Sequence, residues 1–420
     1  MMNKYRVEIF DIWQYLCQAV YEPLIRCRID FSNHLDERLL KKAVTLSFDA
    51  VPLINSCFDG LSFRPRWLGK NFTGDDIVHV TEAEADADEQ IIRLFASTID
   101  FTAEPQLKIH LIRRPDGDTA CMIINHMICD GAGFKEYLYL LSDLYTQCKN
   151  HEEIISLPEY RARGIRPLLA GMTFAEKTGV LRSSYDAYDS ANAREQQGVT
   201  FTQGADSPFM ETRVISEENL VRMKVFAREK GVTLNDMIMT AFARVFCFTT
   251  GTAKIMLPST MDLRKYIPAA TYGIGNLSTN CMCNIGIQEQ ELFTDTLMQV
   301  SGQMQRHKAN KNILKSVMLW NLIVHILPFP FLKRHYAKVV KQPVVSFTNL
   351  GIINNESLHF EDAVIEDVYL TASIKPSPFF QLTVSTYNDR CTLSCNIYGG
   401  DGDKKWVDRF LADVCSELYF

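Results

Sequence analysis

The segment Asn125-His126-Met127-Ile128-Cys129-Asp130-Gly131 combines the residue types of this chain that best suit acid–base chemistry. A neutral imidazole titrates near pH ~6.5, so His126 can accept a proton from a hydroxyl or an amine at neutral pH. Asp130 can form an ion pair that holds the turn. Gly131 lets a substrate approach the backbone and can direct an N–H towards a developing oxyanion. The segment predicts a base-catalysed transfer, but a structural histidine beside a helix-capping aspartate gives the same pattern.

Other reactive residues give weaker signals. Cys129 could act as a nucleophile with His126, but three residues along a turn do not guarantee hydrogen-bond reach, and a buried thiol is the favoured interpretation. The segment from Tyr272 to Asn276 superficially suggests a phosphate loop but lacks the third glycine and the lysine of known versions. Isolated histidines, which are expected to be structural, stand at His110, His307, His325 and His335.

The composition limits the classes of function. The 420 residues include 44 basic and 50 acidic side chains, which gives a net charge of −6, and the chain has no long basic run. A nucleic-acid partner is therefore not expected. Hydrophobic residues make up 47% of the chain and charged residues 22%, as in globular proteins with a full core. This length predicts two or three domains.

Twelve cysteines are scattered along the chain without a C-x-x-C pair. A zinc ribbon or a thioredoxin-type site is therefore not supported, and the thiols are expected in the core. The N-terminus, residues 1–8, lacks the apolar stretch of a secretory signal. These features predict a metal-free protein of the reduced cytoplasm.

The most apolar stretch runs from Val317 to Leu332. It falls short of the ~20 apolar residues that a bilayer span requires. We predict a buried helix that ends at prolines, in preference to a patch on a membrane surface. The polar and proline residues that interrupt the stretch are Asn321, His325, Pro328 and Pro330.

Hydrophobic periodicity predicts the elements that position His126. A helix is expected over residues 35–44, strands over 107–113 and 120–125 with a tight turn between them, and a helix over 134–148. His126 then lies where a buried strand ends, just before a glycine-flanked turn that opens a helix. Functional groups are often placed at such exits from a rigid scaffold.

The remainder of the chain divides into a weakly patterned segment and a second mixed half. Residues 156–208 are predicted to form a crossover linker. Ser216 is expected to cap one helix, and Thr233-Leu234-Asn235-Asp236 resembles a capping box that opens another. Strands are expected over residues 254–258, 344–348, 381–387 and 391–398, with a closing helix over 404–418. Two α/β halves, residues 1–155 and 209–420, are therefore predicted to pack around a shared cleft.

The chain resembles acyltransferases of the chloramphenicol-acetyltransferase-like fold. The resemblance is to the group with alcohol O-acetyltransferases, wax-ester synthase relatives and condensation domains of peptide synthetases. The family's His-His-x-x-x-Asp-Gly motif is matched by residues 125–131. Weaker matches follow in the family's order across nearly the whole chain: Leu39–Ala43 with Val51–Ile54, Glu104–Leu107, Thr233–Met237, Met261–Arg264, Gly275–Asn276 with Asn280, and Ser346–Gly351.

This resemblance implies a two-domain fold of mixed α/β sheets, with pseudo-symmetric halves and a tunnel between them. It implies that His126 is the general base, that Asp130 pairs with Arg264, and that Gly131 keeps the tunnel open. The donor would be a thioester of coenzyme A or of a carrier protein's phosphopantetheine, with no acyl-enzyme, metal or permanently bound cofactor. The residues that it assigns to substrate binding are Asn280, Ser346, Thr348 and Asn349.

Two positions depart from the family pattern. Asn125 replaces the first histidine of the motif, where an amide can hydrogen-bond and support the turn but cannot act as a base. Thr348 replaces a serine and keeps the hydroxyl. Plant-type relatives also manage with the second histidine alone, so the expected role of His126 stands.

The sequence as a whole predicts a free-standing, monomeric acyltransferase that makes an ester or an amide from an acyl thioester. Residues 317–332 could line an acyl tunnel. A carrier-protein-dependent condensation enzyme shares the mechanism and differs in its partner. A binding or docking module that kept the fold and lost turnover is the remaining alternative. Acyl chain length, acceptor identity and the choice of donor are left open by the sequence.

Overall fold

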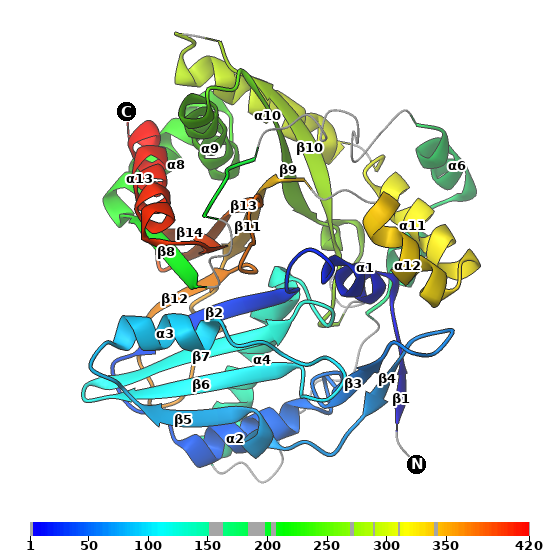
Figure 1. Cartoon of the computed structure of the whole chain (residues 1–420), viewed down its shortest axis with the longest axis vertical. Coiled ribbons are helices and arrows are strands. Elements are labelled where there is room, and N and C mark those ends of the chain that lie inside the picture. The colour runs from blue at the N-terminus through cyan, green and yellow to red at the C-terminus, as the bar shows by residue number, and fades with distance from the viewer. Residues whose placement is uncertain are drawn as a thin grey trace.

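The computed structural model describes residues 3–150, 163–183, 198–202, 207–268, 273–288, 290–309, 311–339 and 343–419, with the backbone alone for 336–339. Within these residues the strands form a five-stranded sheet, a six-stranded sheet and a small three-stranded sheet (Figure 1). The two large sheets lie in different halves of the molecule. The mixed α/β class and the two-lobed arrangement predicted from the sequence are confirmed.

The N-terminal half is built on the five-stranded sheet, in the order β12-β2-β7-β6-β5. Its central strand β7 buries all of its residues, so the apolar run Ala120–Ile124 shows no alternation of polar and apolar residues. Helices α2 and α4 pack on one face and α3 on the other. The bounds are β2 (Leu24–Phe31), β5 (Val78–Glu82), β6 (Leu107–Arg114), β7 (Gly117–Asn125), β12 (Ile365–Thr371), α2 (Glu37–Ser47), α3 (Ala87–Phe95) and α4 (Gly131–Lys149).

The C-terminal half is built on the six-stranded sheet, in the order β10-β9-β11-β13-β14-β8. Its core centres on Phe242 of α9, whose ring lies 5.7–6.3 Å from the rings of Phe347, Phe380 and Phe410. The bounds are β8 (Pro208–Ile215), β9 (Lys254–Asp262), β10 (Ser278–Gly286), β11 (Val345–Ile352), β13 (Phe380–Tyr387), β14 (Arg390–Tyr398), α8 (Glu217–Lys230), α9 (Leu234–Thr250), α10 (Phe293–Ala309) and α13 (Asp401–Leu418).

The predicted helix starts in this half are confirmed in detail. Ser216 accepts a hydrogen bond from the backbone of Asn219, and α8 begins at the next residue, Glu217. Thr233 and Asp236 form a capping box that opens α9. Capping groups satisfy the free N–H donors of a first helical turn, which is why these starts could be found from sequence.

Strand β12 joins the two halves. It comes late in the chain yet pairs antiparallel with β2, so that Val368 lies opposite Ile29 and Leu370 opposite Cys27. The division of the chain into residues 1–155, 156–208 and 209–420 does not anticipate this strand, since nothing in its sequence indicates which sheet it joins. Of the expected linker, α5 (Arg166–Ala170) and α6 (Phe174–Arg182) are seen, while residues 156–162, 184–197 and 203–206 lie outside the described residues.

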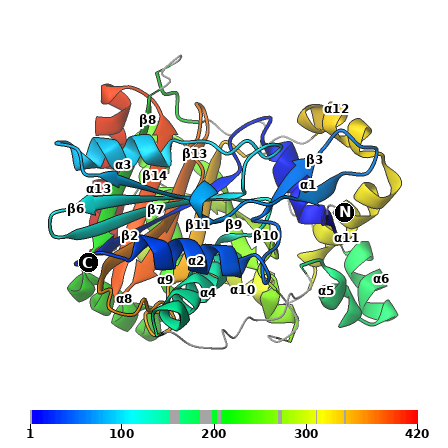
Figure 2. The same ribbon diagram turned by 90° about the horizontal axis from the view of Figure 1, so that it is seen from below.

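A third group of elements lies at one end of the molecule (Figure 2). It contains the small sheet and helices α1, α11 and α12, and α5 and α6 lie beside them. The predicted burial of a helix over residues 317–332 is wrong, because α11 buries one face only. Its predicted end at the prolines is confirmed, since α11 ends at Ile326 and Pro328 precedes α12. The bounds are β1 (Lys4–Arg6), β3 (Ser56–Asp59), β4 (Arg66–Gly69), α1 (Ile9–Cys17), α11 (Leu314–Ile326) and α12 (Phe329–Val339).

No single described helix combines the length and the apolar character needed to cross a bilayer. The bent pair of α8 and α9 meets the criterion only when the two are taken together, and most of α9 is buried in the core.

Candidate active site

The predicted motif forms the turn between β7 and α4. Asn125, the last residue of β7, is fully buried. Its side-chain amide donates to Gln106 Oε1 at 2.6 Å, and its side-chain oxygen accepts from the backbone of Met127 at 2.9 Å. The next residue, His126, donates its backbone N–H to the carbonyl of Pro23 at 2.8 Å. Asn125 therefore points away from the histidine ring and closes the turn that presents it.

The protonation of the His126 ring follows from its partners. Asn276 donates its side-chain N–H groups to the carbonyls of His126 at 2.8 Å and Met127 at 3.0 Å, which fixes the orientation of this amide. Its Oδ1 then lies 3.2 Å from His126 Nδ1, and the carbonyl of Cys129 lies 2.9 Å from the same nitrogen. Both neighbours are acceptors, so Nδ1 carries the proton and the lone pair is on Nε2.

The surroundings of His126 favour the neutral ring. Burial lowers the pKa of His126, and the negative charge of Asp130 and the hydrogen bonds of the ring offset this only in part. Gln14, on α1, brings its amide nitrogen to 3.4 Å from Nε2. The basic nitrogen is therefore unprotonated at neutral pH and lies beside a hydrogen-bond donor.

Asp130 and Arg264 form a two-pronged ion pair, with N–O distances of 2.9 and 3.0 Å. Asp130 also accepts from the backbone N–H groups of Gly133 at 2.9 Å and Leu277 at 2.8 Å, while Arg264 donates to the carbonyl of Gly275 at 2.8 Å. Burial would raise the pKa of Asp130, but the Arg264 charge and these bonds hold it below its usual range. The pair thus clamps residues 275–277 against the motif.

The motif glycines allow close packing of the two halves. A Cβ on Gly131 would lie 2.3 Å from the side chain of Leu350, and one on Gly133 would lie 2.7 Å from the carbonyl oxygen of Gly275. Any larger side chain at Gly133 would push the loop of Asn276 away from α4. Gly131 therefore both packs against Leu350 and lines the cavity.

A cavity of about 630 Å³ lies between the halves and contains His126. Strands β9, β10 and β11 of the C-terminal half form much of its wall. Thr348 accepts from Gln381 at 2.7 Å and lies 3.4 Å from Thr260, so its hydroxyl belongs to a small polar network on that wall. The lining residues that the sequence predicted are His126, Asp130, Gly131, Arg264, Asn280, Ser346, Thr348 and Asn349.

No family model and no curated protein matches the sequence. Solved structures match over nearly the whole chain. The trichothecene 15-O-acetyltransferase TRI3 from Fusarium sporotrichioides is 12% identical, with a TM-score of 0.74, covering 100% of this chain and 96% of that chain. The epimerization domain from the third module of tyrocidine synthetase B is 13% identical, with a TM-score of 0.68, covering 100% and 96%.

Polyketide synthase associated protein 5 from Mycobacterium tuberculosis is 17% identical, with a TM-score of 0.68, covering 99% of this chain and 97% of that chain. The chain has the chloramphenicol-acetyltransferase-like fold. This confirms the fold that the motif and its companion segments predicted. At such low identities the likeness concerns the fold, so the chemistry must be argued from the residues of this cavity.

Sequence reasoning missed several cavity residues of this chloramphenicol-acetyltransferase-like chain. Trp13 and Gln14 come from α1 and Trp320 from α11. The two indole rings meet edge to face at 5.4 Å, and Trp320 donates to the carbonyl of Ile9 at 2.9 Å. The helical spacing of Phe10, Trp13 and Cys17 was a usable signal for α1. Nothing local indicates which helix it meets.

Lys375 is another cavity residue, and no pattern in the sequence predicted its position. It lines the cavity, and its ammonium group lies 3.1 Å from the ring centroid of Tyr21. Burial lowers the pKa of Lys375 to about 7. A lysine in a loop ordinarily projects into solvent, so its burial could be found only in three dimensions.

A second buried ion pair supports the motif from the other side. Arg163 donates to Asp11 at 3.0 and 3.3 Å and to the carbonyls of Met127 at 3.3 Å and Ile128 at 2.9 Å. Asp11 also accepts from the Trp67 indole at 3.0 Å. Both charges are almost completely buried. This pair fixes the backbone that follows His126.

Cys129 shows no activation. Its side chain is fully buried. Burial raises the pKa of the Cys129 thiol far above its usual range. The thiolate that a nucleophile requires is therefore absent at neutral pH, which supports the structural interpretation of this cysteine.

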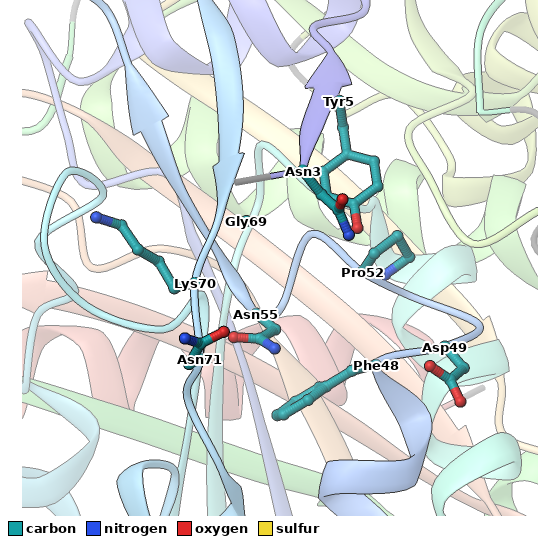
Figure 3. Close-up of a pocket in the computed structure, with 9 residues that line it drawn as sticks. All are labelled: Asn3, Tyr5, Phe48, Asp49, Pro52, Asn55, Gly69, Lys70 and Asn71. Atoms are coloured by element: carbon teal, nitrogen blue, oxygen red, sulfur yellow. The ribbon is translucent and has the colours of Figure 1, made fainter. Parts of the chain in front are cut away.

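Another pocket, of about 650 Å³, lies beside the small sheet (Figure 3). Its wall is rich in amides, and it contains none of the predicted site residues. The lining residues are Asn3, Tyr5, Phe48, Asp49, Pro52, Asn55, Gly69, Lys70 and Asn71. Asp49 and Lys70 are its charged residues, and no histidine or cysteine joins them, so the central cavity remains the candidate active site.

Proposed function

We propose that this protein is an acyltransferase that moves an acyl group from a thioester to an alcohol or an amine, with His126 as the general base. The observation that carries the proposal is the tautomer of His126. Asn276 and the Cys129 carbonyl occupy Nδ1, so the lone pair is on Nε2, beside the Gln14 amide at 3.4 Å and at a cavity lined by both halves of the fold. A neutral, oriented imidazole is what deprotonation of a hydroxyl requires.

In the proposed reaction the acceptor transfers its proton to Nε2 of His126 as its oxygen or nitrogen bonds to the thioester carbonyl carbon. The carbonyl becomes an oxyanion. When this tetrahedral intermediate collapses, the carbon–sulfur bond breaks and the proton on His126 passes to the departing thiolate. The Cys129 carbonyl and Asn276 accept from Nδ1 throughout, so they stabilise the imidazolium that forms.

The N-terminus of α4 supports stabilisation of the oxyanion. Asp130 caps this 19-residue helix by accepting from Gly133, which leaves the N–H groups of Gly131 and Ala132 without partners inside the helix. Gly131 and Ala132 both line the cavity. The helix dipole adds partial positive charge at this end.

The polar wall of the cavity supports a pantetheine-type donor. Ser346, Thr348, Asn349 and Gln381 present hydroxyl and amide groups that suit the amides of such an arm. A volume of about 630 Å³ is within the usual range for small-molecule sites. Coenzyme A and a carrier protein's phosphopantetheine carry the same arm, so the proposal includes both donors.

Thiol release from a panel of acyl-coenzyme A donors, with mixed alcohols and amines, tests the proposal. His126→Ala should lower acceptor-dependent release by ~10²–10⁴-fold at an unchanged melting temperature, because that is the usual contribution of a general base. The matched control is His110→Gln in β6, where the half-buried ring lies against His79 at 5.5 Å. It should keep wild-type activity.

Each outcome has a definite meaning. Equal activity of wild type and His126→Ala would reject His126 as the base. If no coenzyme A thioester is used, acyl-phosphopantetheinyl carrier proteins are supplied, and turnover with them alone would assign the carrier-dependent reaction. Binding of acyl thioesters without turnover of either donor would favour a non-catalytic module of the same fold.

A further inference from the structure

Helix α11 is apolar on two faces, and only one of them is covered. Leu314 and Val317 are buried. On the opposite face Leu319, Leu322, Ile323 and Ile326 follow the i, i+3, i+4, i+7 spacing of a single helical stripe and are 41%, 55%, 40% and 67% exposed. A continuous exposed stripe of this kind marks an interaction surface rather than scattered surface residues.

Neighbouring elements extend this stripe. Phe331 on α12 and Phe63 in the loop between β3 and β4 are 47% and 65% exposed, and the backbone of Phe329 donates to the Phe63 carbonyl at 3.4 Å. Helix α6 is tied to the start of α11 by the Lys311–Glu176 ion pair at 2.8 Å. We call this group of exposed apolar side chains the apolar corner. Its residues are Leu61, Phe63, Phe174, Leu181, Leu319, Leu322, Ile323, Ile326 and Phe331.

Helices α11 and α12, which carry most of the apolar corner, lie in a basic stretch of the sequence, although the chain as a whole is acidic. Between Asp295 and Glu356 the sequence contains no aspartate or glutamate. Lys333 and Arg334 are exposed on α12, next to Phe331. The basic residues of the acid-free stretch are Arg306, Lys308, Lys311, Lys315, Lys333, Arg334, Lys338 and Lys341.

We propose that the apolar corner docks on an anionic phospholipid bilayer. Apolar side chains flanked by lysine and arginine suit the boundary between acyl chains and negative headgroups, where the apolar groups are buried and the cations stay near phosphate. The four elements that carry the corner, α6, α11, α12 and the β3–β4 loop, lie at the same end of the molecule (Figure 2). They can therefore meet one surface together.

The position of the corner also links the bilayer to the active-site cavity. The same helix α11 that carries the exposed stripe contributes Ser316, Val317 and Trp320 to the cavity wall. Helix α11 would therefore lie between the bilayer and the cavity, and docking would bring the active site close to lipid-soluble substrates. The supply of substrate from the bilayer rests on the proposed acyl transfer, whereas docking itself does not.

Flotation with lipid vesicles, without any acyl donor, tests docking. The full chain should float with vesicles of phosphatidylcholine and phosphatidylglycerol, bind weakly to phosphatidylcholine alone, and dissociate as salt is raised. Leu322→Asn/Ile326→Asn should weaken binding at least ~tenfold, because each removes one apolar side chain from the interface. Lys333→Glu/Arg334→Glu should weaken it to a similar degree and only on anionic vesicles.

The matched control is Val221→Asn/Val225→Asn on α8, whose side chains have the same i, i+4 spacing and are 49% and 51% exposed. It should bind as wild type does, and melting temperatures should agree among all variants. Failure of the wild type to float, or equal loss in the α8 control, would overturn the proposal. Dimers in sedimentation velocity that Leu322→Asn/Ile326→Asn dissociates would assign the corner to self-association instead. Acyl transfer measured with water-soluble substrates is separate from all these results.

Discussion

Two buried aspartate–arginine pairs flank the turn that carries His126, and they differ in what they touch. Asp11–Arg163 joins α1 to the segment before α5 and bonds the backbone carbonyls of Met127 and Ile128. Asp130–Arg264 joins the motif to the C-terminal half and bonds the backbone of Gly275 and Leu277. The first pair is 1% and 3% exposed, and the second is 5% and 21% exposed.

The difference separates support of the scaffold from support of the base. Asp130–Arg264 lines the cavity and holds the loop of Asn276, which in turn fixes the His126 tautomer. Asp11–Arg163 holds the backbone that follows the histidine and is fully withdrawn from solvent. We therefore expect changes in Asp130–Arg264 to act on rate and stability together, and changes in Asp11–Arg163 to act mainly on stability.

The largest expected effect is on folding stability. Arg163→Leu leaves the Asp11 carboxylate buried without its cation and should lower the free energy of unfolding by about 3–5 kcal/mol. Urea denaturation measures this, and kcat of the folded fraction should stay close to wild type. Arg213→Leu is the control, because its pair with Asp408 is exposed and should contribute only about 0–1 kcal/mol. Equal denaturation midpoints for the two variants would show that the buried pair stabilises the fold no more than the exposed pair does.

Asp130→Asn should affect both properties. Arg264 is partly exposed and keeps its second carboxylate partner, Asp262, at 3.1 Å, so the loss of the Asp130 charge should cost about 2–3 kcal/mol of unfolding free energy. Displacement of the Asn276 loop should also lower kcat by about 10²-fold. Adding Asn276→Ala to this variant should lower kcat little further, since both changes act on His126 through one path. Additive losses in kcat would show that Asp130 acts independently of Asn276.

Asn276→Asp should have a smaller effect, which is on the pKa of His126. A carboxylate accepting from Nδ1 stabilises the imidazolium and should raise the pKa of His126. The acidic limb of kcat/KM against pH should move upwards accordingly. Asn280→Asp is the control, since Asn280 lines the same cavity but bonds to Thr260 instead of the histidine. A limb that moves equally in both variants would indicate a general field effect.

The smallest effect concerns the wild-type pH profile. Because burial lowers the pKa of His126, the neutral ring persists below pH 6.5 and is lost only as the pH falls through the lowered pKa. The acidic limb of kcat/KM should therefore lie below pH 6.5, in steady-state assays at constant ionic strength. A limb above that value would mean that the charge of Asp130 outweighs burial.

The elements around the motif could be predicted because their signals are local. Strands β6 and β7 and helix α4 show their periodicity within a few residues and are found close to their predicted bounds, and helices α8 and α9 begin at the predicted caps. The prediction that α11 is buried was wrong, because a fully buried apolar helix and an apolar helix with one solvent-exposed face can have the same composition. The partner of β12 depends on contacts that no local pattern encodes.

The candidate site likewise contains residues that the sequence predicted and residues that only the fold brings together. His126, Asp130 and Gly131 lie within one short segment of the sequence, and Arg264 was found through resemblance to a family. Asp11 and Arg163 lie far apart in sequence and meet only in the fold. The replacement of the first motif histidine also has a structural answer: Asn125 bonds Gln106 and the Met127 amide, away from the His126 ring, so its side chain serves the turn.

The pairing of β12 with β2 has a consequence for synthesis of the chain. Until the ribosome has made residues 365–371, β2 is an uncovered edge of the first sheet, and most of its side chains are of the kind that become buried. An open edge of this sort can pair with other chains. Long-range pairing of this kind also slows folding. We therefore expect the nascent N-terminal half to depend on chaperones, and fragments that stop before β12 to aggregate.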